Sequence, residues 1–377
     1  MTKTDDHVKA SWLFPVILVV GLAARLLVAT LGQDYDMDSW QIMAKLADHG
    51  DNVYASTDRY NFAPGWFQIL HALNLLSGHH PTVFRYAVSG FLSLGDAGIF
   101  FILWHRFGKL AACWFFLNPV SVIVSGYQCN FDNLGIFLGL VAVWQMGDEF
   151  DQPVNRRKLL GLLILGLSLV VKHVFFAFPF WLAVRQKGML QKLIVIVVPI
   201  FIFLLSFLPY WHTGSQGIIH NVFLYRSMPL NYFYLMFVPA SVQNAFDSLT
   251  VWLLLLALFA FIYRQKSAVE SMLFYTGLLV ATSPAMVNEY LAIPGAFVAT
   301  HLNLFTVLYT VLATLRLLVD ANGLHLGGAD PATSFNFACY ALFALGLALV
   351  WVTWRKNILN LVEWCASEVT NQLGIRK

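Results

Sequence analysis

The chain has 377 residues, of which 59% belong to the apolar set AVILMFWYC and only 11% are charged, and its formal net charge is +3. An average soluble domain is about 45–50% apolar and about 25% charged. So few charged side chains cannot cover a water-facing surface of this size, which excludes a soluble or disordered protein. The basic residues are scattered, which excludes nucleic acid as a partner. The composition predicts an integral membrane protein in contact with the lipid bilayer.

The apolar segments predict an all-α, polytopic bundle of about 12 membrane-spanning helices, because one span needs roughly 20 apolar residues. Two regions, 158–185 and 290–319, are too long for one span and too short for two, and polar residues interrupt both. Each is predicted to form a hairpin of short helices. No repeat or domain boundary is visible in the sequence, so residues 1–377 form one predicted membrane domain. Single spans are predicted at 11–31, 82–104, 110–127, 131–147, 191–211, 248–263, 267–285 and 335–354.

Lysine and arginine residues concentrate in alternate loops, which predicts how the chain crosses the bilayer. Cytoplasmic loops carry an excess of these residues. With the N-terminus in the cytoplasm, 16 of the 23 Lys and Arg residues lie on that side. Both termini are then cytoplasmic, residues 355–377 form an amphipathic cytoplasmic tail, and the loops 32–80 and 212–247 are extracytoplasmic.

The first extracytoplasmic loop begins with Asp34, Asp36 and Asp38, directly after the first predicted span. Helically spaced apolar residues at 38–48, and a second apolar stretch at 65–77, predict amphipathic helices at the membrane interface. Three carboxylates within five residues repel one another, which raises the pKa of at least one of them or binds a cation. That pattern fits a general base or a divalent-cation site, and it also fits acidic residues that are merely hydrated.

Two further polar clusters fall on the same predicted face. Gln128 and Asp132, in the stretch SGYQCNFDN (125–133), carry groups that hydrogen-bond hydroxyl-rich ligands, although a polar turn between helices has the same composition. Lys172 and His173 lie at the tip of the first predicted hairpin. They form either a cationic socket for a phosphate or a lysine that extends to the lipid headgroups.

Other ionisable residues near the predicted spans divide into two groups. A charge inside the bilayer costs about 2.5–3.5 kcal/mol, so each should face the bundle interior. Arg25 and Asp96 are expected to form a structural pair. Glu289 with Tyr290, and Arg226 in the long outer loop, lie on the predicted outer face and are expected to border the same cavity as the aspartates.

This set of residues suits the transfer of a sugar from a lipid-phosphate donor. A carboxylate takes the proton of the acceptor hydroxyl, and Lys or Arg neutralises the departing phosphate. The sequence has no Gly-rich phosphate loop, HExxH motif or Ser-His-Asp set, so neither nucleotide chemistry nor a bound cofactor is predicted. A divalent cation at Asp34 and Asp36 is left open. Stacking surfaces for sugar rings are expected from Trp40, Tyr54, Tyr60 and Trp66.

Five motifs follow one another over about residues 10–300: DYDMDSW, NVYASTDRYNFAPGW, FLNPVSVIVSGYQCNFDNLGIFLGL, VVKHVFFAFPFWL and SPAMVNEYLAIP. In this order they resemble the GT-C superfamily of polytopic membrane glycosyltransferases, especially bacterial members similar to the GPI mannosyltransferases and the dolichyl-phosphate-hexose-dependent transferases. The resemblance implies an inverting transfer of a hexose, such as mannose or glucose, from a polyprenyl-phosphate donor to a hydroxyl group of a glycan, glycolipid or protein. It also implies the bacterial inner membrane, with the active site outside the cytoplasm, and the building of a cell-envelope glycan.

Residue roles follow from these motifs. The resemblance gives the base role to Asp36, with Asp34 as its neighbour and rival. Tyr127, where relatives often have histidine, and Cys129 depart from the family's pattern and leave the role of their turn open. Donor-phosphate binding falls to Lys172 and His173, assisted by Arg59 or Arg226. Contacts with the sugar or the acceptor are expected from Trp40, Tyr54, Tyr60, Gln128, Asp132, Glu289 and Tyr290.

Two other functions compete with this interpretation. A transporter or flippase of a lipid-linked saccharide predicts essential charges at mid-membrane depth and on both faces, whereas here they concentrate on one predicted face. A structural scaffold explains neither the interfacial loop nor its acidic cluster.

Overall fold

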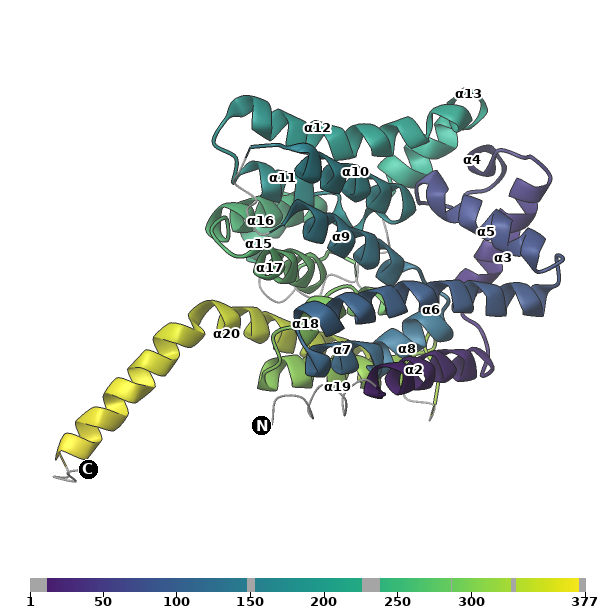
Figure 1. The fold of residues 1–377 in the computed structure, drawn as a ribbon. Coiled ribbons are helices and arrows are strands. Elements are labelled where there is room, and N and C mark those ends of the chain that lie inside the picture. The colour runs from purple at the N-terminus through teal and green to yellow at the C-terminus, as the bar shows by residue number, and fades with distance from the viewer. Residues whose placement is uncertain (1–11, 148–152, 226–237, 286, 327–329, 373–377) are drawn as a thin grey trace, which may run out of the picture.

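The computed structural model of the chain is a bundle of helices (Figure 1). Every regular element within the residues it describes is a helix. The all-α fold class expected from the sequence is therefore confirmed. The structure describes residues 12–147, 153–225, 238–285, 287–326 and 330–372, and of 356–372 it describes only the backbone.

Four helices form the first layer: α2 (Leu13–Ala29), α6 (Pro81–Arg106), α7 (Lys109–Phe116) and α8 (Pro119–Gly126). α2 packs against α6 and α8. The Asn118 side chain accepts a hydrogen bond from the backbone N–H of Val120, at 2.9 Å, and Pro119 occupies the first position of α8. These are start signals for a new helix. The single span predicted at 110–127 is consequently two helices with a bend of 46° between them.

The first outer loop folds into three helices of its own: α3 (Tyr35–Asp48), α4 (Val53–Ser56) and α5 (Pro64–Leu76). Two of them match the helices predicted at 38–48 and 65–77 closely. They gather with α13 (Leu208–Gly217) at one end of the bundle, on the right in Figure 1, which we call the loop end. Buried aromatic side chains hold this unit together, such as Trp66 stacked on Phe131 with ring centroids 4.3 Å apart.

The predicted hairpin at 158–185 is present. α9 (Asp132–Met146) runs away from the loop end, and α10 (Arg156–Val171) returns along it. After the 3₁₀ turn η1 (His173–Phe175), the short helix α11 (Phe178–Ala183) leads back, so that the Gln186 Oε1 atom accepts a hydrogen bond from the Lys158 amine at 2.8 Å. The tip of this hairpin therefore lies at the loop end, and its base lies at the opposite end of the bundle.

The second predicted hairpin, at 290–319, is also present. The Asn288 side chain donates a hydrogen bond to Asp320 at 2.7 Å, which joins the two ends of the hairpin. Asn303 caps the returning helix by accepting from the backbone N–H groups of Phe305 and Thr306.

The remaining elements are α12 (Met189–Ser206), the π-helix η2 (Ile218–Phe223), α15 (Ala240–Ala245), α16 (Ser248–Ile262), α17 (Ala268–Ala281), the 3₁₀ turn η3 (Asn288–Ala292), α18 (Gly295–Ala299), α19 (Leu304–Val319) and α20 (Pro331–Gln372).

The lengths and composition of the helices indicate a membrane protein. Within the described chain, three are long and apolar enough to cross a bilayer, at Pro81–Arg106, Met189–Ser206 and Pro331–Arg355. The bent pair α7–α8 is a fourth if it counts as one span, and five further apolar helices have 10–17 residues. Only 11% of the most apolar 18-residue window of α12 is buried inside the protein, so its apolar side chains face outward.

A buried ion pair fixes the first layer. The Nε atom of Arg25 lies 2.7 Å from a carboxylate oxygen of Asp96, and both side chains are fully buried. The same guanidinium donates to the backbone oxygen of Phe116 at 2.8 Å and to the Ser121 hydroxyl at 2.8 Å. The pairing expected between Arg25 and Asp96 is confirmed, and it ties α2 to α6, α7 and α8.

Removing one partner of this pair should destabilise the protein. Arg25→Met leaves the Asp96 carboxylate buried without a cation, which costs about 3 to 5 kcal/mol. We expect a fall of this size in the free energy of unfolding, measured by denaturant titration in detergent micelles. The double variant Arg25→Met/Asp96→Leu should regain much of the loss, because it leaves no buried charge. An exposed arginine, Arg156→Gln, serves as the control, and equal stability of R25M and this control would contradict the role of the pair.

Candidate functional site

The acidic cluster lies at the start of α3, at the loop end of the bundle. Asp34 precedes the helix, and its carboxylate accepts a hydrogen bond from the backbone N–H of Tyr35 at 2.6 Å. Asp36 lies in the first helical turn, where the positive end of the helix dipole favours a carboxylate. Its Oδ2 atom accepts from the Asn130 side chain at 2.9 Å. Asp38 faces away and accepts from Gln33 at 2.7 Å. The two aspartates expected to act together, Asp34 and Asp36, thus have separate partners.

The turn between α8 and α9 brings Asn130 to Asp36. Cys129 has a φ of 52°, a left-handed conformation that turns the chain sharply. The Cys129 backbone oxygen accepts a hydrogen bond from the indole of Trp40 at 3.2 Å, which attaches the turn to α3. The sequence pointed to this turn through its polar composition. Only the structure shows that Asn130 is the residue that contacts the expected base.

Lys172 connects the hairpin tip to the same turn. Its Nζ atom lies 3.1 Å from the Asp132 carboxylate, and the two side chains are 5% and 0% exposed. The amine also lies 4.4 Å from the ring centroids of Phe62 and Phe131. Lys172 is therefore held inside the protein and does not extend to lipid headgroups. Gly135 permits this approach, because a Cβ atom there would lie only 3.0 Å from the Cβ of Lys172.

The carboxylates and cations at the loop end act on one another. Burial is the largest influence on Asp36 and raises its pKa, and the charge of Asp132 adds to this effect, while Lys172 and Arg59 oppose it. Burial also raises the pKa of Glu289 to about 8, with the charges of Asp36 and Asp132 contributing. Three carboxyl groups therefore interact with one another and with two cations. We call these five residues the charged cluster: Asp36, Asp132, Glu289, Lys172 and Arg59. It joins four segments that are far apart in the sequence.

Arg59, one of the two cations of the charged cluster, has hydrogen-bond donors that the described residues do not use. Its guanidinium lies 4.2 Å from the ring centroid of Tyr35. Its Nε and Nη2 atoms are buried and have no hydrogen-bond partner among the residues the structure describes. The other arginine expected here, Arg226, lies outside the described residues.

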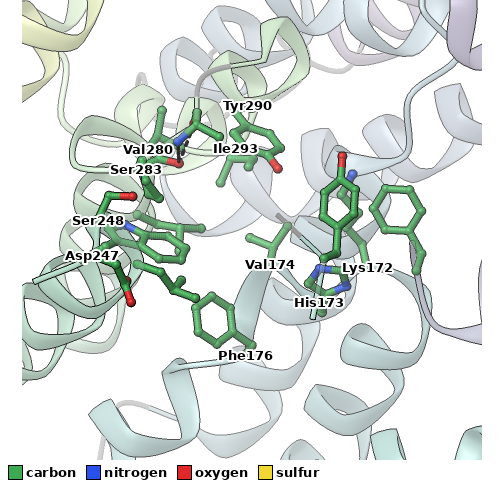
Figure 2. Close-up of a pocket in the computed structure, with 17 residues that line it drawn as sticks. Lys172, His173, Val174, Phe176, Asp247, Ser248, Val280, Ser283, Tyr290 and Ile293 are labelled. Atoms are coloured by element: carbon green, nitrogen blue, oxygen red, sulfur yellow. Dashed lines mark hydrogen bonds between the residues drawn. The ribbon is translucent and has the colours of Figure 1, made fainter. Parts of the chain in front are cut away.

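A cavity of about 320 Å³ borders the charged cluster (Figure 2). Figure 2 shows Lys172 and His173 on one side of it and Asp247, Ser248 and Ser283 on the other. Most of the wall is apolar. The lining residues are Phe62, Lys172, His173, Val174, Phe176, Tyr225, Asp247, Ser248, Leu249, Trp252, Leu279, Val280, Ser283, Pro284, Ala285, Tyr290 and Ile293.

The predicted cationic role of His173 needs correction. Burial, and then the neighbouring charge of Lys172, lower the pKa of His173 from 6.5 to about 4. The imidazole is therefore neutral near pH 7. It supplies an N–H donor or a nitrogen acceptor to the cavity, and only Lys172 supplies charge on this wall.

The aromatic residues expected to stack on sugar are instead buried. Trp40 and Tyr54 are each 2% exposed, while Tyr60 and Trp66 are fully buried. The Tyr54 hydroxyl donates to the backbone oxygen of Phe62 at 2.9 Å, and the Tyr60 hydroxyl donates to that of Ala63 at 2.6 Å. No open ring face is presented by these four residues. Their role in this structure is to pack the loop and to place Phe62 over Lys172.

The remaining predicted residues divide between the cavity and the interior. Tyr290 lines the cavity, and Glu289 belongs to the charged cluster. Gln128 is fully buried, and its Nε2 atom donates to the backbone oxygen of Asn322 at 2.8 Å. Its Oε1 atom has no hydrogen-bond partner among the described residues. Asp132 holds Lys172, as described above.

A polar network that the sequence did not reveal holds Asn288, the residue before Glu289. The Asn288 side chain accepts from Arg316 at 2.9 Å and donates to Asp320. Arg316 lies 2.7 Å from the Asp320 carboxylate, and both contact Ser334. These contacts fix η3 against α19 and α20.

Within the described part of the chain, no group of three or more His, Cys, Asp and Glu side chains has an arrangement that could hold a metal ion. No protein-family model matches the sequence, and no curated protein matches it. The function must therefore be argued from the site itself.

The carboxyl group of Asp34 is expected to titrate near neutral pH. Burial, and then the charge of Asp36, raise its pKa from 3.8 to about 7. Between these two values the folded protein holds a proton that the unfolded chain has lost. The free energy of unfolding should therefore fall as the pH rises from about 4 to about 7.

Denaturant titrations of the wild type and of Asp34→Asn across this pH range test that expectation. The variant should lose less stability than the wild type as the pH rises, and Asp38→Asn should behave as the wild type does. Identical pH dependence in the wild type and D34N would show that Asp34 does not hold the extra proton.

Proposed function

We propose that the protein is a multi-pass membrane glycosyltransferase of GT-C type, which transfers a hexose from a polyprenyl-phosphate donor to a hydroxyl acceptor with inversion. One observation carries the proposal: Asp36 and Lys172 belong to one charged cluster that borders a largely apolar cavity between helices. A sugar phosphate on a lipid needs this combination of a base, a cation and a hydrocarbon-lined space.

The base role of Asp36 rests on its environment. A general base works best when its pKa lies close to the operating pH, and burial raises the pKa of both Asp36 and Asp34. The hydrogen bonds of the two carboxylates therefore decide between them. Asn130 holds one carboxylate oxygen at 2.9 Å, which orients the group and leaves the other oxygen for the acceptor. Asp34, the rival for this role, has its carboxylate hydrogen-bonded to the start of α3.

The reaction balances with these groups. The acceptor oxygen forms a bond to the anomeric carbon from one side of the sugar, and its proton passes to Asp36. The bond between the anomeric carbon and the phosphate oxygen breaks on the other side, and the electron pair leaves with polyprenyl phosphate. Configuration at the anomeric carbon inverts, and no covalent enzyme intermediate is needed.

The leaving phosphate requires positive charge and hydrogen-bond donors. Lys172 lines the cavity and is oriented by Asp132 at 3.1 Å. Arg59 has two buried donors without partners among the described residues, and a guanidinium binds phosphate through such a pair. Neutral His173 adds an N–H donor. These groups stabilise negative charge where it develops, which lowers the barrier.

The cavity suits a small polar group attached to a lipid. Its volume of about 320 Å³ lies at the lower end of the range for small-molecule pockets, roughly 300–1,000 Å³. Leu249 and Trp252 of α16, Leu279 of α17 and Phe176 beside η1 give it an apolar side. We infer that the sugar phosphate lies near Lys172 and that the polyprenyl chain leaves past α16 and α17.

The proposed topology has about 12 spans with both termini in the cytoplasm. Apolar helices of 10–17 residues, such as α9 and α16, would be the short spans of this arrangement. The loop end would then face away from the cytoplasm of a bacterial inner membrane, and the basic loops at the opposite end would face inward.

Asp36→Asn should abolish the base without changing the shape of the side chain. We expect its rate of hexose transfer to fall by about 10²–10⁴-fold, the usual contribution of a general base. The assay uses purified full-length protein with polyprenyl-phosphate mannose or glucose and a hydroxyl acceptor, and mass spectrometry follows loss of the donor's sugar.

Asp38→Asn is the matched control, because Asp38 lies on the same helical turn and is exposed. It should retain transfer. Full activity in D36N would overturn the base assignment. Movement of intact donor across liposomes without loss of its sugar would favour the flippase alternative.

Arg59→Gln should weaken the hydrogen bonds that the protein makes to the donor phosphate. A hydrogen bond to a charged group contributes about 1.5–3 kcal/mol, so kcat/KM for the donor should fall about ten- to one-hundred-fold. Lys45→Gln, an exposed basic residue of α3, is the control. Unchanged kcat/KM in R59Q would remove Arg59 from the phosphate site while leaving the base assignment intact.

A further inference from the structure

A second hollow lies at the end of the bundle opposite the charged cluster. It has a volume of about 710 Å³ and lies where α6 ends, α17 begins, α18 turns into α19, and α20 leaves the bundle (Figure 1). We call it the opposite-end pocket. It does not share any lining residue with the cavity beside Lys172.

Two basic side chains, those of Lys266 and Arg355, line the opposite-end pocket. Both act electrostatically on His301, which also lines it. Burial is the largest influence on His301 and lowers its pKa, and the charges of Arg355 and Lys266 lower it further. Lys266 comes from the turn between α16 and α17 and Arg355 comes from α20, and both line the same pocket as His301.

Among the described residues that line the pocket, Glu270 is the one carboxylate, and it accepts hydrogen bonds at the start of α17. It accepts hydrogen bonds from the backbone N–H of Ser267 at 3.2 Å and from the Ser267 hydroxyl at 3.1 Å. The Lys266 amine lies 3.8 Å from its other oxygen, which is longer than a hydrogen bond. Glu270 thus neutralises only part of the positive charge of the pocket. The side chain of Arg355 is exposed and can contact a ligand.

Apolar side chains are exposed on the helices around these cations. Phe107 lines the pocket and is 37% exposed, while Trp354, beside Arg355, is 54% exposed. Val350, one helical turn earlier on α20, is 53% exposed. A ligand that places an anion on Lys266 and Arg355 would therefore meet hydrocarbon surface next to the anion site.

We propose that the opposite-end pocket binds the phosphate group of an anionic phospholipid. Basic pockets between membrane helices bind such headgroups through the same combination of cations and neighbouring apolar surface. The volume accommodates a headgroup, and the exposed side chains of α20 and Phe107 offer contacts for acyl chains. This site does not depend on the proposed sugar transfer, because no residue of the charged cluster takes part in it.

Binding to the full-length protein in detergent tests the proposal. Native mass spectrometry and thermal-shift measurements would compare phosphatidylglycerol, phosphatidylcholine and inorganic phosphate. We expect phosphatidylglycerol to bind at least tenfold more tightly than phosphatidylcholine. The double variant Lys266→Gln/Arg355→Gln should weaken phosphatidylglycerol binding at least tenfold while remaining folded.

The matched control is Arg156→Gln, which removes one positive charge from an exposed position at the same end of the bundle. It should bind phosphatidylglycerol as the wild type does. Protection by inorganic phosphate alone, lost in the double variant, would identify a soluble phosphate as the ligand and overturn the lipid assignment. Equal binding of phosphatidylglycerol by wild type and double variant, or an equal loss in R156Q, would overturn the site itself.

Discussion

The contact between Lys172 and Asp132 is the interaction on which the loop end of the molecule depends. A buried pair at 3.1 Å is stable only when further contacts replace the water that both charges have lost. Here the rings of Phe62 and Phe131 lie 4.4 Å from the amine. Phe62 comes from the first outer loop, Phe131 precedes α9, and Lys172 ends α10. One amine therefore joins the outer loop to two helices of the bundle, and the cavity is bounded where they meet.

The charged cluster is not neutral in itself, and this imbalance has chemical consequences. The three carboxyl groups of Asp36, Asp132 and Glu289 outnumber the two cations Lys172 and Arg59. Burial is the largest influence that raises the pKa of Asp36 and of Glu289, and repulsion among the carboxyl groups adds to it. Burial, and then the charges of Asp36 and Asp132, raise the pKa of Glu289 to about 8, so this carboxyl group holds its proton at neutral pH. A carboxylate whose pKa lies near neutral pH can take a proton from a hydroxyl and return it. Even with a proton on Glu289, the cluster carries no net positive charge that would attract a phosphate. Binding must therefore rely on local donors such as those of Arg59.

Sequence reasoning succeeded where one local signal was enough. The polar interruptions at Lys172–His173 and at His301–Asn303 predicted hairpins, the helical spacing of apolar residues predicted α3 and α5, and the cost of burying a charge predicted the pairing of Arg25 with Asp96. It failed where the answer depends on contacts between distant segments. Aromatic residues in a loop have the same pattern whether they meet a sugar or one another, and Trp40, Tyr54 and Tyr60 do the latter. The contacts of Asn130 with Asp36, and of Asn288 with Arg316 and Asp320, join segments up to about a hundred residues apart and leave no periodic signal.

The positions of the two central charges along their helices explain how a mostly apolar protein accommodates them. Lys172 follows the last residue of α10, and Asp132 is the first residue of α9. A cation at the C-terminus of a helix and an anion at an N-terminus are each stabilised by the helix dipole. The two helix ends come close because α9 presents glycine to the hairpin tip: a Cβ atom at Gly139 would lie 2.0 Å from the ring of Phe175. Larger residues there would push the tip outward, separate Lys172 from Asp132 and leave both charges buried without a partner. The glycine residues of α9 thus allow Lys172 and Asp132 to pair, and this pair in turn holds the site together.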